Sequence, residues 1–212
     1  DSVERFEGLG VHVIKGYAAF TSPKELVVNN QIIRAKKFVI ATGSVPRIPP
    51  IDGLQDVTYL TNETIFNLTT LPDHLIIIGG GPIGCEMAQA FCHLGSKVTI
   101  IARSTLLPQD DSDIVAVART HMVNDGIELY EESETHHIAK EGANIKVTLK
   151  TKNNVERIIN GSHLLIATGR TPNIEKLNLN AAQIEHDKHG ITVDACMRTN
   201  NKRVFALGDC TK

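Results

Sequence analysis

A glycine-rich turn between an apolar run and a helical pattern constrains the fold of this chain more than any other feature. The run Leu75–Ile78 is rich in β-branched residues and ends at residues 79–84, Gly-Gly-Gly-Pro-Ile-Gly, which have the spacing G-x-G-x-x-G. Apolar residues then recur at helical spacing from Met87 to Leu94. The sequence therefore predicts a strand, a tight turn and a helix without interruption.

This turn is typical of a dinucleotide-binding site. Gly79 permits the turn, Gly81 lets the backbone approach a diphosphate, and Gly84 lets the helix pack closely on the strand. Free N–H groups and the positive end of the helix dipole favour phosphate at the same place, and Pro82 suits a first helical turn. An unrelated glycine-rich turn is the alternative, but the flanking strand and helix patterns argue against it.

The residues after the next predicted strand, Lys97–Ile101, indicate which dinucleotide binds. A site selective for NAD normally places Asp or Glu there to accept hydrogen bonds from the adenosine ribose, but this chain has Ala102-Arg103-Ser104. A carboxylate would repel a 2′-phosphate, whereas Arg103 can pair with it and Ser104 can donate a hydrogen bond. We therefore predict a preference for NADP(H). The alternative is a solvated surface arginine.

The remaining patterns predict a parallel sheet followed by a small antiparallel meander, because the hydrophobic period switches to two after the third parallel strand. We expect helices at 61–71 and 111–124, a proline-rich connection at 44–53, and strands at 11–14, 25–28, 37–41, 127–130, 137–140, 144–150, 155–159, 163–169 and 204–209.

Two of these strands end in the same tripeptide, Ala-Thr-Gly, at residues 41–43 and 167–169. Such an end lets a flat ligand or another backbone approach closely, although a simple strand exit is an alternative. The last strand ends at Gly208-Asp209, where a carboxylate either binds a ribityl or ribose hydroxyl or serves as a solvated cap. Glu86 lies in the first turn of the predicted helix, where it either complements the helix dipole or contacts the nicotinamide end of the cofactor.

The composition excludes several classes of protein. The 212 residues are 42% hydrophobic, enough for one large or two small domains, and the net charge of -2 leaves no basic surplus for nucleic acid or an anionic membrane. Apolar runs are far shorter than the roughly 20 residues of a membrane helix, and no signal peptide opens the chain. The four cysteines lack paired spacing, which indicates a reducing compartment, and we expect the cytoplasm.

We predict no metal site. Cys85 and Cys92 are seven apart on one helical face, as core residues would be. A second group, His186, Asp187, His189 and Cys196, fits no standard zinc spacing.

Five motifs follow one another along nearly the whole chain. They are Gly16-Tyr17-Ala18-Ala19-Phe20, Ala41-Thr42-Gly43-Ser44 with Pro46, Gly79 to Glu86, Ala167-Thr168-Gly169-Arg170 with Pro172-Asn173, and Ala206-Leu207-Gly208-Asp209. As an ordered set they resemble the pyridine nucleotide-disulfide oxidoreductases, FAD flavoproteins that include dihydrolipoamide dehydrogenase, glutathione reductase and mercuric reductase. Residues 95–106 and 197–199 look most like mercuric reductase, whereas residues 79–84 have the glycine form of dihydrolipoamide dehydrogenases.

The resemblance implies an α/β fold in which a Rossmann-like NAD(P)-binding domain, residues 50–172, with a parallel sheet and a meander, lies between two partial pieces of a FAD-binding domain, residues 1–49 and 173–212. Hydride would pass from NAD(P)H to FAD and then to a redox cysteine pair upstream of this chain. The parent would be a homodimer through a C-terminal domain. We therefore interpret the chain as an excised fragment that binds nucleotide, has no catalytic residue of its own and lacks reductase turnover.

The patterns and this resemblance together predict the residues that contact each cofactor. Those for NADP or NAD are Gly79, Gly80, Gly81, Pro82, Ile83, Gly84, Glu86, Arg103, Ser104 and Gly169. Those for FAD in the intact parent are Ala18, Thr42, Gly43 and Asp209. Two other functions stay open: a stand-alone nucleotide-binding module without catalysis, and a flavoprotein of the NADH oxidase or ferredoxin reductase type. A cysteine pair encoded upstream would favour the disulfide reductase.

Overall fold

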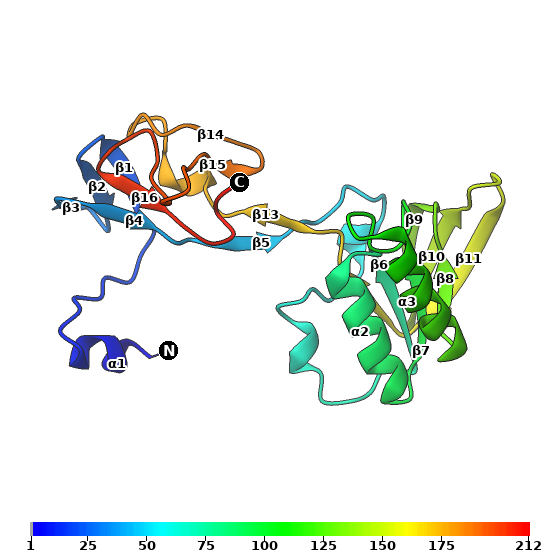
Figure 1. Cartoon of the computed structure of the whole chain (residues 1–212). Helices are drawn as coiled ribbons and strands as arrows, with labels where there is room; N and C mark the ends of the chain where they lie inside the picture. Colours follow the sequence, from blue (N-terminus) through cyan, green and yellow to red (C-terminus); the bar gives the residue numbers. More distant parts are fainter. Residues whose placement is uncertain (1) are drawn as a thin grey trace. The chain divides into compact units, whose positions relative to one another are not determined.

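The computed structural model describes residues 2–212, which divide into two compact units (Figure 1). Unit 1 comprises the chain up to Val45 together with residues 171–212, and unit 2 comprises residues 46–170. The chain passes from one unit to the other in β5 (Ser44–Pro46) and β13 (Arg170–Pro172), which pair with each other. The fold is mixed α/β, as the sequence predicts.

A parallel four-stranded sheet in the order β12-β6-β7-β8 forms the centre of unit 2. Its strands are β6 (His74–Ile78), β7 (Lys97–Ile101), β8 (Glu128–Tyr130) and β12 (His163–Ile166). The last four residues of β6 and of β7 and the last three of β12 are buried. Continuous burial is expected where both faces of a parallel sheet are covered.

Two helices cover one face of this sheet. Helix α2 (Pro82–His93) follows the glycine turn, and α3 (Ser112–Asn124) leads into β8. Buried residues of both helices pack with Leu75 and Ile77 of β6. Gly95 has φ +107°, so it ends α2 in the left-handed conformation that the sequence predicts.

The antiparallel meander covers the opposite face, as Figure 1 shows beside the parallel strands. It consists of β9 (Glu134–Glu141), β10 (Asn144–Lys150) and β11 (Glu156–Gly161), with β10 in the middle. Its buried residues pack with Ile76 and Ile78 of β6, whose side chains alternate with those that face the helices. The predicted meander is therefore confirmed.

Unit 1 is mostly strands. One sheet is antiparallel and contains β1 (Ala19–Ser22), β2 (Glu25–Val28) and β3 (Gln31–Arg34). In a second sheet, β4 (Phe38–Ile40) pairs in parallel with β16 (Val204–Ala206). The short elements of the two units are α1 (Val3–Gly8), η1 (Leu54–Asp56), η2 (Ile65–Asn67), η3 (Glu175–Leu177), β14 (His186–Asp187) and β15 (Gly190–Ile191).

The structure corrects two local predictions and adds one element that was not predicted. Residues 11–14 form no strand, because the described chain offers their backbone no partner strand. Residues 61–71 contain only the single 3₁₀ turn η2 instead of an α-helix. The short helix α1 was not predicted. Among residues 2–212, no helix is both long and apolar enough to cross a bilayer.

Candidate functional site

The glycine turn after β6 is crowded at two positions and open at a third. Gly79 has φ +125°, and its N–H donates to the Ile101 carbonyl at 2.9 Å. A β-carbon on Gly79 would collide with the Ala167 carbonyl, and one on Gly84 with the Gly79 carbonyl. A β-carbon on Gly81 would meet no atom within 4 Å. Gly79 and Gly84 thus have the turning and packing roles that the sequence predicts, and Gly81 leaves space beside the turn.

No side chain caps the N-terminus of α2. Gly81 is its N-cap residue, Pro82 occupies the first turn, and the first turn contains no acidic residue. The first amides of a helix have no intrahelical partner, and they lie at the positive end of the dipole. An uncapped start beside open space is therefore suited to the oxygens of a diphosphate.

Glu86 lies one turn further along α2 than the sequence pattern predicts. The helix begins at Pro82, which places Glu86 in the second turn, where its side chain is exposed. Its predicted role of complementing the helix dipole from the first turn is therefore wrong, because that effect fades beyond the first turn. Ile83, at the helix start, is half-buried. Contact of these two residues with a nicotinamide stays a prediction.

Gly169 lies at the same edge of the sheet as the glycine turn. It follows β12, the neighbour of β6, and the Ala167 N–H donates to the Ile78 carbonyl at 2.8 Å. Gly169 has φ +110°, and its carbonyl accepts the Arg47 N–H at 3.0 Å. The carboxyl ends of parallel strands form the ligand-binding edge of such sheets.

The loop after β7, residues 102–107, is fixed at both of its ends. The Ala102 N–H donates to the Tyr130 carbonyl at 2.8 Å, and the Leu107 N–H donates to the Gly80 carbonyl at 2.8 Å. Gly80 also has no room for a side chain, since a β-carbon there would lie 2.7 Å from that of Ala102. The loop that contains the predicted selectivity residues is therefore attached directly to the glycine turn.

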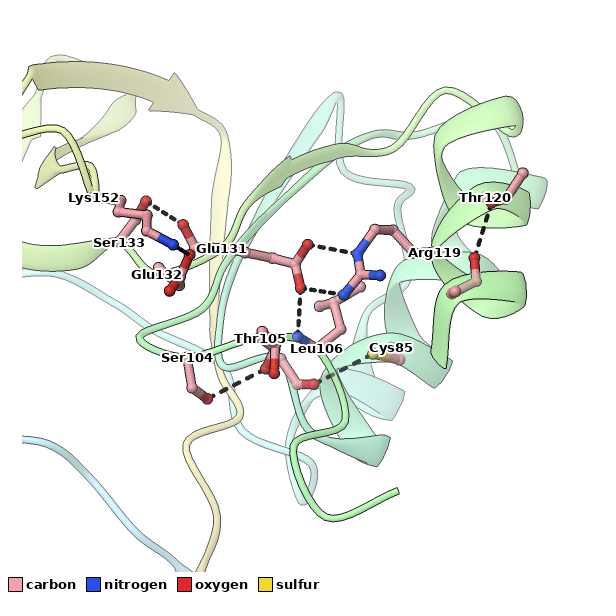
Figure 2. Close-up of polar contacts among 12 residues, drawn as sticks. Cys85, Ser104, Thr105, Leu106, Arg119, Thr120, Glu131, Glu132, Ser133 and Lys152 are labelled. Carbon is pink, nitrogen blue, oxygen red and sulfur yellow. Dashed lines mark hydrogen bonds and ion pairs between the residues drawn. The ribbon is translucent and has the colours of Figure 1, made fainter. Parts of the chain in front are cut away.

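A carboxylate holds this loop in place (Figure 2). Glu131 accepts the Leu106 N–H at 2.7 Å and is held by Arg119 of α3, which donates from Nε at 2.7 Å and from a terminal nitrogen at 2.9 Å. The Arg119 guanidinium and, to a lesser degree, the Leu106 N–H keep the pKa of Glu131 below its ordinary value. Glu131 thus stays ionised and joins α3 to the loop at neutral pH.

A polar cavity of about 350 Å³ lies beside the predicted selectivity residues. Its lining residues are Arg103, Glu132, Glu134, His136, Lys150, Thr151 and Asn154. Ser104 is exposed, its hydroxyl donates to the Thr105 carbonyl at 3.2 Å, and its own carbonyl accepts the Glu132 N–H at 3.1 Å. The structure therefore places Arg103 at a hollow in the surface.

The two cysteines of α2 differ in burial. Cys85 is buried under the glycine turn, where its thiol donates to the Gly80 carbonyl at 3.5 Å, and burial raises its pKa to about 11. Cys92 is half-buried and packs against the apolar cluster between the helices and the parallel sheet, to which Cys85 belongs. A thiol with so high a pKa is scarcely ionised at neutral pH, so Cys85 is the core residue that the sequence predicts.

In unit 1, three of the residues predicted for FAD, Thr42, Gly43 and Asp209, follow the carboxyl ends of β4 and β16, and Ala18 directly precedes β1. Thr42 and Ala18 line an apolar cavity of about 120 Å³. Gly43 has φ +65°, with open space where a β-carbon would be. The Ser44 hydroxyl donates to Asp209 at 2.8 Å, which brings the two strand ends together.

Sequence reasoning missed Glu131, Arg119 and the part of the cavity that the meander forms. Glu131 lies 25 residues after Leu106 and 12 after Arg119, so no local spacing reveals the contact. The only available indication was a carboxylate placed directly after the third parallel strand, at the edge where ligands bind.

Comparisons with known proteins agree with this geometry. The sequence model described as pyridine nucleotide-disulphide oxidoreductase matches residues 2–212. The mercuric reductase of Lysinibacillus sphaericus is 38% identical over 201 residues, which cover 94% of this chain and 37% of that protein. The mercuric reductase of Bacillus cereus is 38% identical over 211 residues, which cover 99% of this chain and 33% of that protein.

Among solved structures, the HOCl-induced flavoprotein disulfide reductase RclA from Escherichia coli superimposes with a TM-score of 0.85 at 31% identity, covering 98% of this chain and 48% of that one. The chain therefore spans between a third and a half of the length of these relatives. Because the family match extends over the whole described chain, the chain belongs to the pyridine nucleotide-disulphide oxidoreductase family.

Proposed function

We propose that this chain is the nucleotide-binding portion of a FAD-dependent NAD(P)H oxidoreductase whose acceptor is a disulfide or mercuric ion. Unit 2 binds NAD(P)H for hydride transfer to the flavin. The observation that supports this most directly is the uncapped N-terminus of α2 beside the open space at Gly81. The family and the two mercuric reductases at 38% identity support the acceptor class.

The residues of unit 2 fit a dinucleotide. The turn from Gly79 to Gly84, with Gly80, Gly81, Pro82 and Ile83 between them, holds the diphosphate through backbone amides. Glu86 and Gly169 lie toward the nicotinamide, which supplies the hydride when the cofactor is bound. The residues of the chain position the two ends of the nucleotide, the nicotinamide and the adenosine.

The adenosine end decides between NADP and NAD. Arg103 is exposed beside a cavity, and its own loop, residues 102–107, contains no Asp or Glu, although Glu132 and Glu134 also line the cavity. A guanidinium forms strong charge-assisted hydrogen bonds with a phosphate, and Ser104 adds a hydroxyl. We therefore assign NADP(H) as the preferred nucleotide.

We assign FAD to unit 1. Ala18, Thr42, Gly43 and Asp209 are the contacts that we propose in the intact parent, within the domain pieces 1–49 and 173–212 around the nucleotide domain 50–172. The open space at Gly43 and the cavity at Thr42 suit the close approach of a flat ligand. We further propose that the parent is a homodimer in the cytoplasm, where the four unpaired cysteines would stay reduced.

Calorimetric titration of the purified 212-residue chain with NADPH and with NADH tests the proposal. We expect NADPH to bind at least about ten-fold more tightly, a difference of about 1.4 kcal/mol. Arg103→Glu should abolish the preference by repelling the 2′-phosphate. Arg157→Glu, which makes the same charge change on β11 outside the cavity, should keep it. If neither nucleotide binds at millimolar concentration, the proposed function is wrong.

A further inference from the structure

We propose that the meander supplies half of the 2′-phosphate subsite, with Lys150 as a second cation opposite Arg103 and Lys152 as a positioning residue that neutralises Glu132. This inference rests on the proposed function, because it specifies how the same nucleotide site recognises NADP(H). It concerns the cavity of about 350 Å³ beside Arg103.

The cavity has two walls from different parts of unit 2. Arg103 and Glu132 belong to the segments that follow β7 and β8 at the carboxyl edge of the parallel sheet. Lys150, Thr151 and Asn154 belong to the end of β10 and the turn after it. An anion beside Arg103 would therefore also lie near the meander turn.

Two of the cations that line this cavity have no charged partner among the described residues. Within residues 2–212, neither Arg103 nor Lys150 forms an ion pair or a side-chain hydrogen bond, and both side chains are exposed. By contrast, Glu132 is paired with Lys152, whose Nζ lies 2.5 Å from Oε2 (Figure 2). The pair offsets the carboxylate that would otherwise oppose an anion beside Arg103.

The cations without an ion pair favour a phosphate over a bare ribose. Arg103 and Lys150 line the cavity, and Lys152 offsets the charge of Glu132. A phosphate monoester has a charge of about -1.5 to -2 at pH 7, so it gains from these two cations, whereas a ribose hydroxyl does not. Two carboxylates work against the phosphate, because Glu134 on β9 and Glu156 on β11 lie opposite Lys150 in the ladders of β10.

The meander wall is held by backbone hydrogen bonds. The Thr151 N–H donates to the Val155 carbonyl at 3.0 Å, and the Asn154 N–H donates to the Thr151 carbonyl at 2.8 Å. Lys150 is the last residue of β10 and is paired with β11, so the backbone from which its side chain extends is held in place. The Asn154 amide offers a neutral donor on the same wall.

Binding of adenosine 2′,5′-bisphosphate and of 5′-AMP to the full chain tests this subsite without requiring turnover. Lys150→Gln should weaken the bisphosphate by roughly ten-fold and change 5′-AMP by less than about two-fold, because only the former presents the 2′-phosphate. Lys140→Gln is the matched control, since it removes an exposed lysine of β9 outside the cavity. Equal affinity of wild type and Lys150→Gln for the bisphosphate would overturn the inference.

The role of Lys152 needs a second pair of variants. Lys152→Gln should weaken the bisphosphate by exposing Glu132 as a negative charge, and adding Glu132→Gln should restore the affinity. A merely structural effect of Lys152 would not be rescued. If wild-type chain prefers NADPH while the Lys150 and Lys152 variants leave that preference unchanged, the inference alone fails. If wild-type chain binds neither nucleotide, the proposed function fails with it.

Discussion

Helices α2 and α3 lie on the same face of one parallel sheet, yet their N-termini are built in opposite ways. The first turn of α2 has the N-cap Gly81 and no acidic residue. At α3, the side chain of the N-cap Asp111 accepts the Asp113 N–H at 2.9 Å, and Asp113 adds a second carboxylate. Helix α3 satisfies one of its free amides with its own N-cap side chain, whereas no side chain accepts from the first amides of α2.

This difference separates a capped helix start from the uncapped one at which we propose that the diphosphate binds. A capping side chain stabilises a helix by about 1 kcal/mol, and α2 forgoes this gain. Its position is secured instead by the close contact of Gly84 with the Gly79 carbonyl. Four predictions, each with a control variant, test the different construction of the two helices.

The largest effect is expected at Gly84. Gly84→Val would place side-chain atoms against the Gly79 carbonyl and should lower the free energy of unfolding by about 3 kcal/mol, as severe overpacking does. The equivalent third helical position of α3 is Ile114, which is 69% exposed, so Ile114→Ala should cost less than about 1 kcal/mol. Urea unfolding measures both, and similar values would contradict the packing role of Gly84.

Gly81→Asp would convert the start of α2 into the kind found at α3. The new side chain enters open space, so stability should stay equal or rise by up to about 1 kcal/mol. Its charge would occupy the place of the diphosphate and should weaken NADPH by at least about ten-fold in calorimetry. Gly81→Ala adds bulk without charge and should weaken NADPH less. Unchanged affinity in Gly81→Asp would place the diphosphate elsewhere.

Glu131→Gln tests how α3 supports the loop after β7. Because Arg119 depresses the pKa of Glu131 below 4.5, the contribution of the carboxylate is complete above that pH and is lost as the pH falls through the lower folded-state pKa. We expect Glu131→Gln to cost about 2 kcal/mol of unfolding free energy at pH 7 and less at pH 3. Urea unfolding at both values measures this. Glu86→Gln, on the exposed face of α2, should show no such difference.

Asp111→Ala should have the smallest effect. Loss of the cap should lower the free energy of unfolding by about 1 kcal/mol, and Asp111→Asn should retain most of it, because an amide oxygen also accepts the Asp113 N–H. NADPH affinity should stay within about two-fold of wild type. A large loss of affinity would mean that α3 takes part in binding.

The sequence predicted those elements whose causes are local. The turn from Gly79 to Gly84 follows from residue spacing, and α3 follows from a helical apolar pattern that begins at Asp111 and ends before Gly126. The α/β class and the meander follow from the change of hydrophobic period. The strand predicted at residues 11–14 failed because a strand also needs a partner, which a pattern within one segment does not provide.

Long-range contacts explain what the sequence did not predict. The hydrogen bond from the Leu106 N–H to Glu131 joins residues that are 25 positions apart. The contribution of Lys150 to the cavity depends on how the meander folds over the sheet. Neither residue belongs to a motif. The predicted cofactor contacts of Gly169, Arg103 and Asp209 remain predictions, and the nucleotide titrations above address that of Arg103.

The hydrogen bonds at the two ends of the loop after β7 have an evolutionary consequence. Ala102 is tied to Tyr130, and Leu107 is tied to Gly80, while residues 103–105 between them are exposed. The side chains of these three residues can therefore be replaced without removing the backbone hydrogen bonds that hold the loop at its two ends. Under the proposed function, a change of coenzyme preference would act through these three positions and through the hairpin of β10 and β11 that contains Lys150.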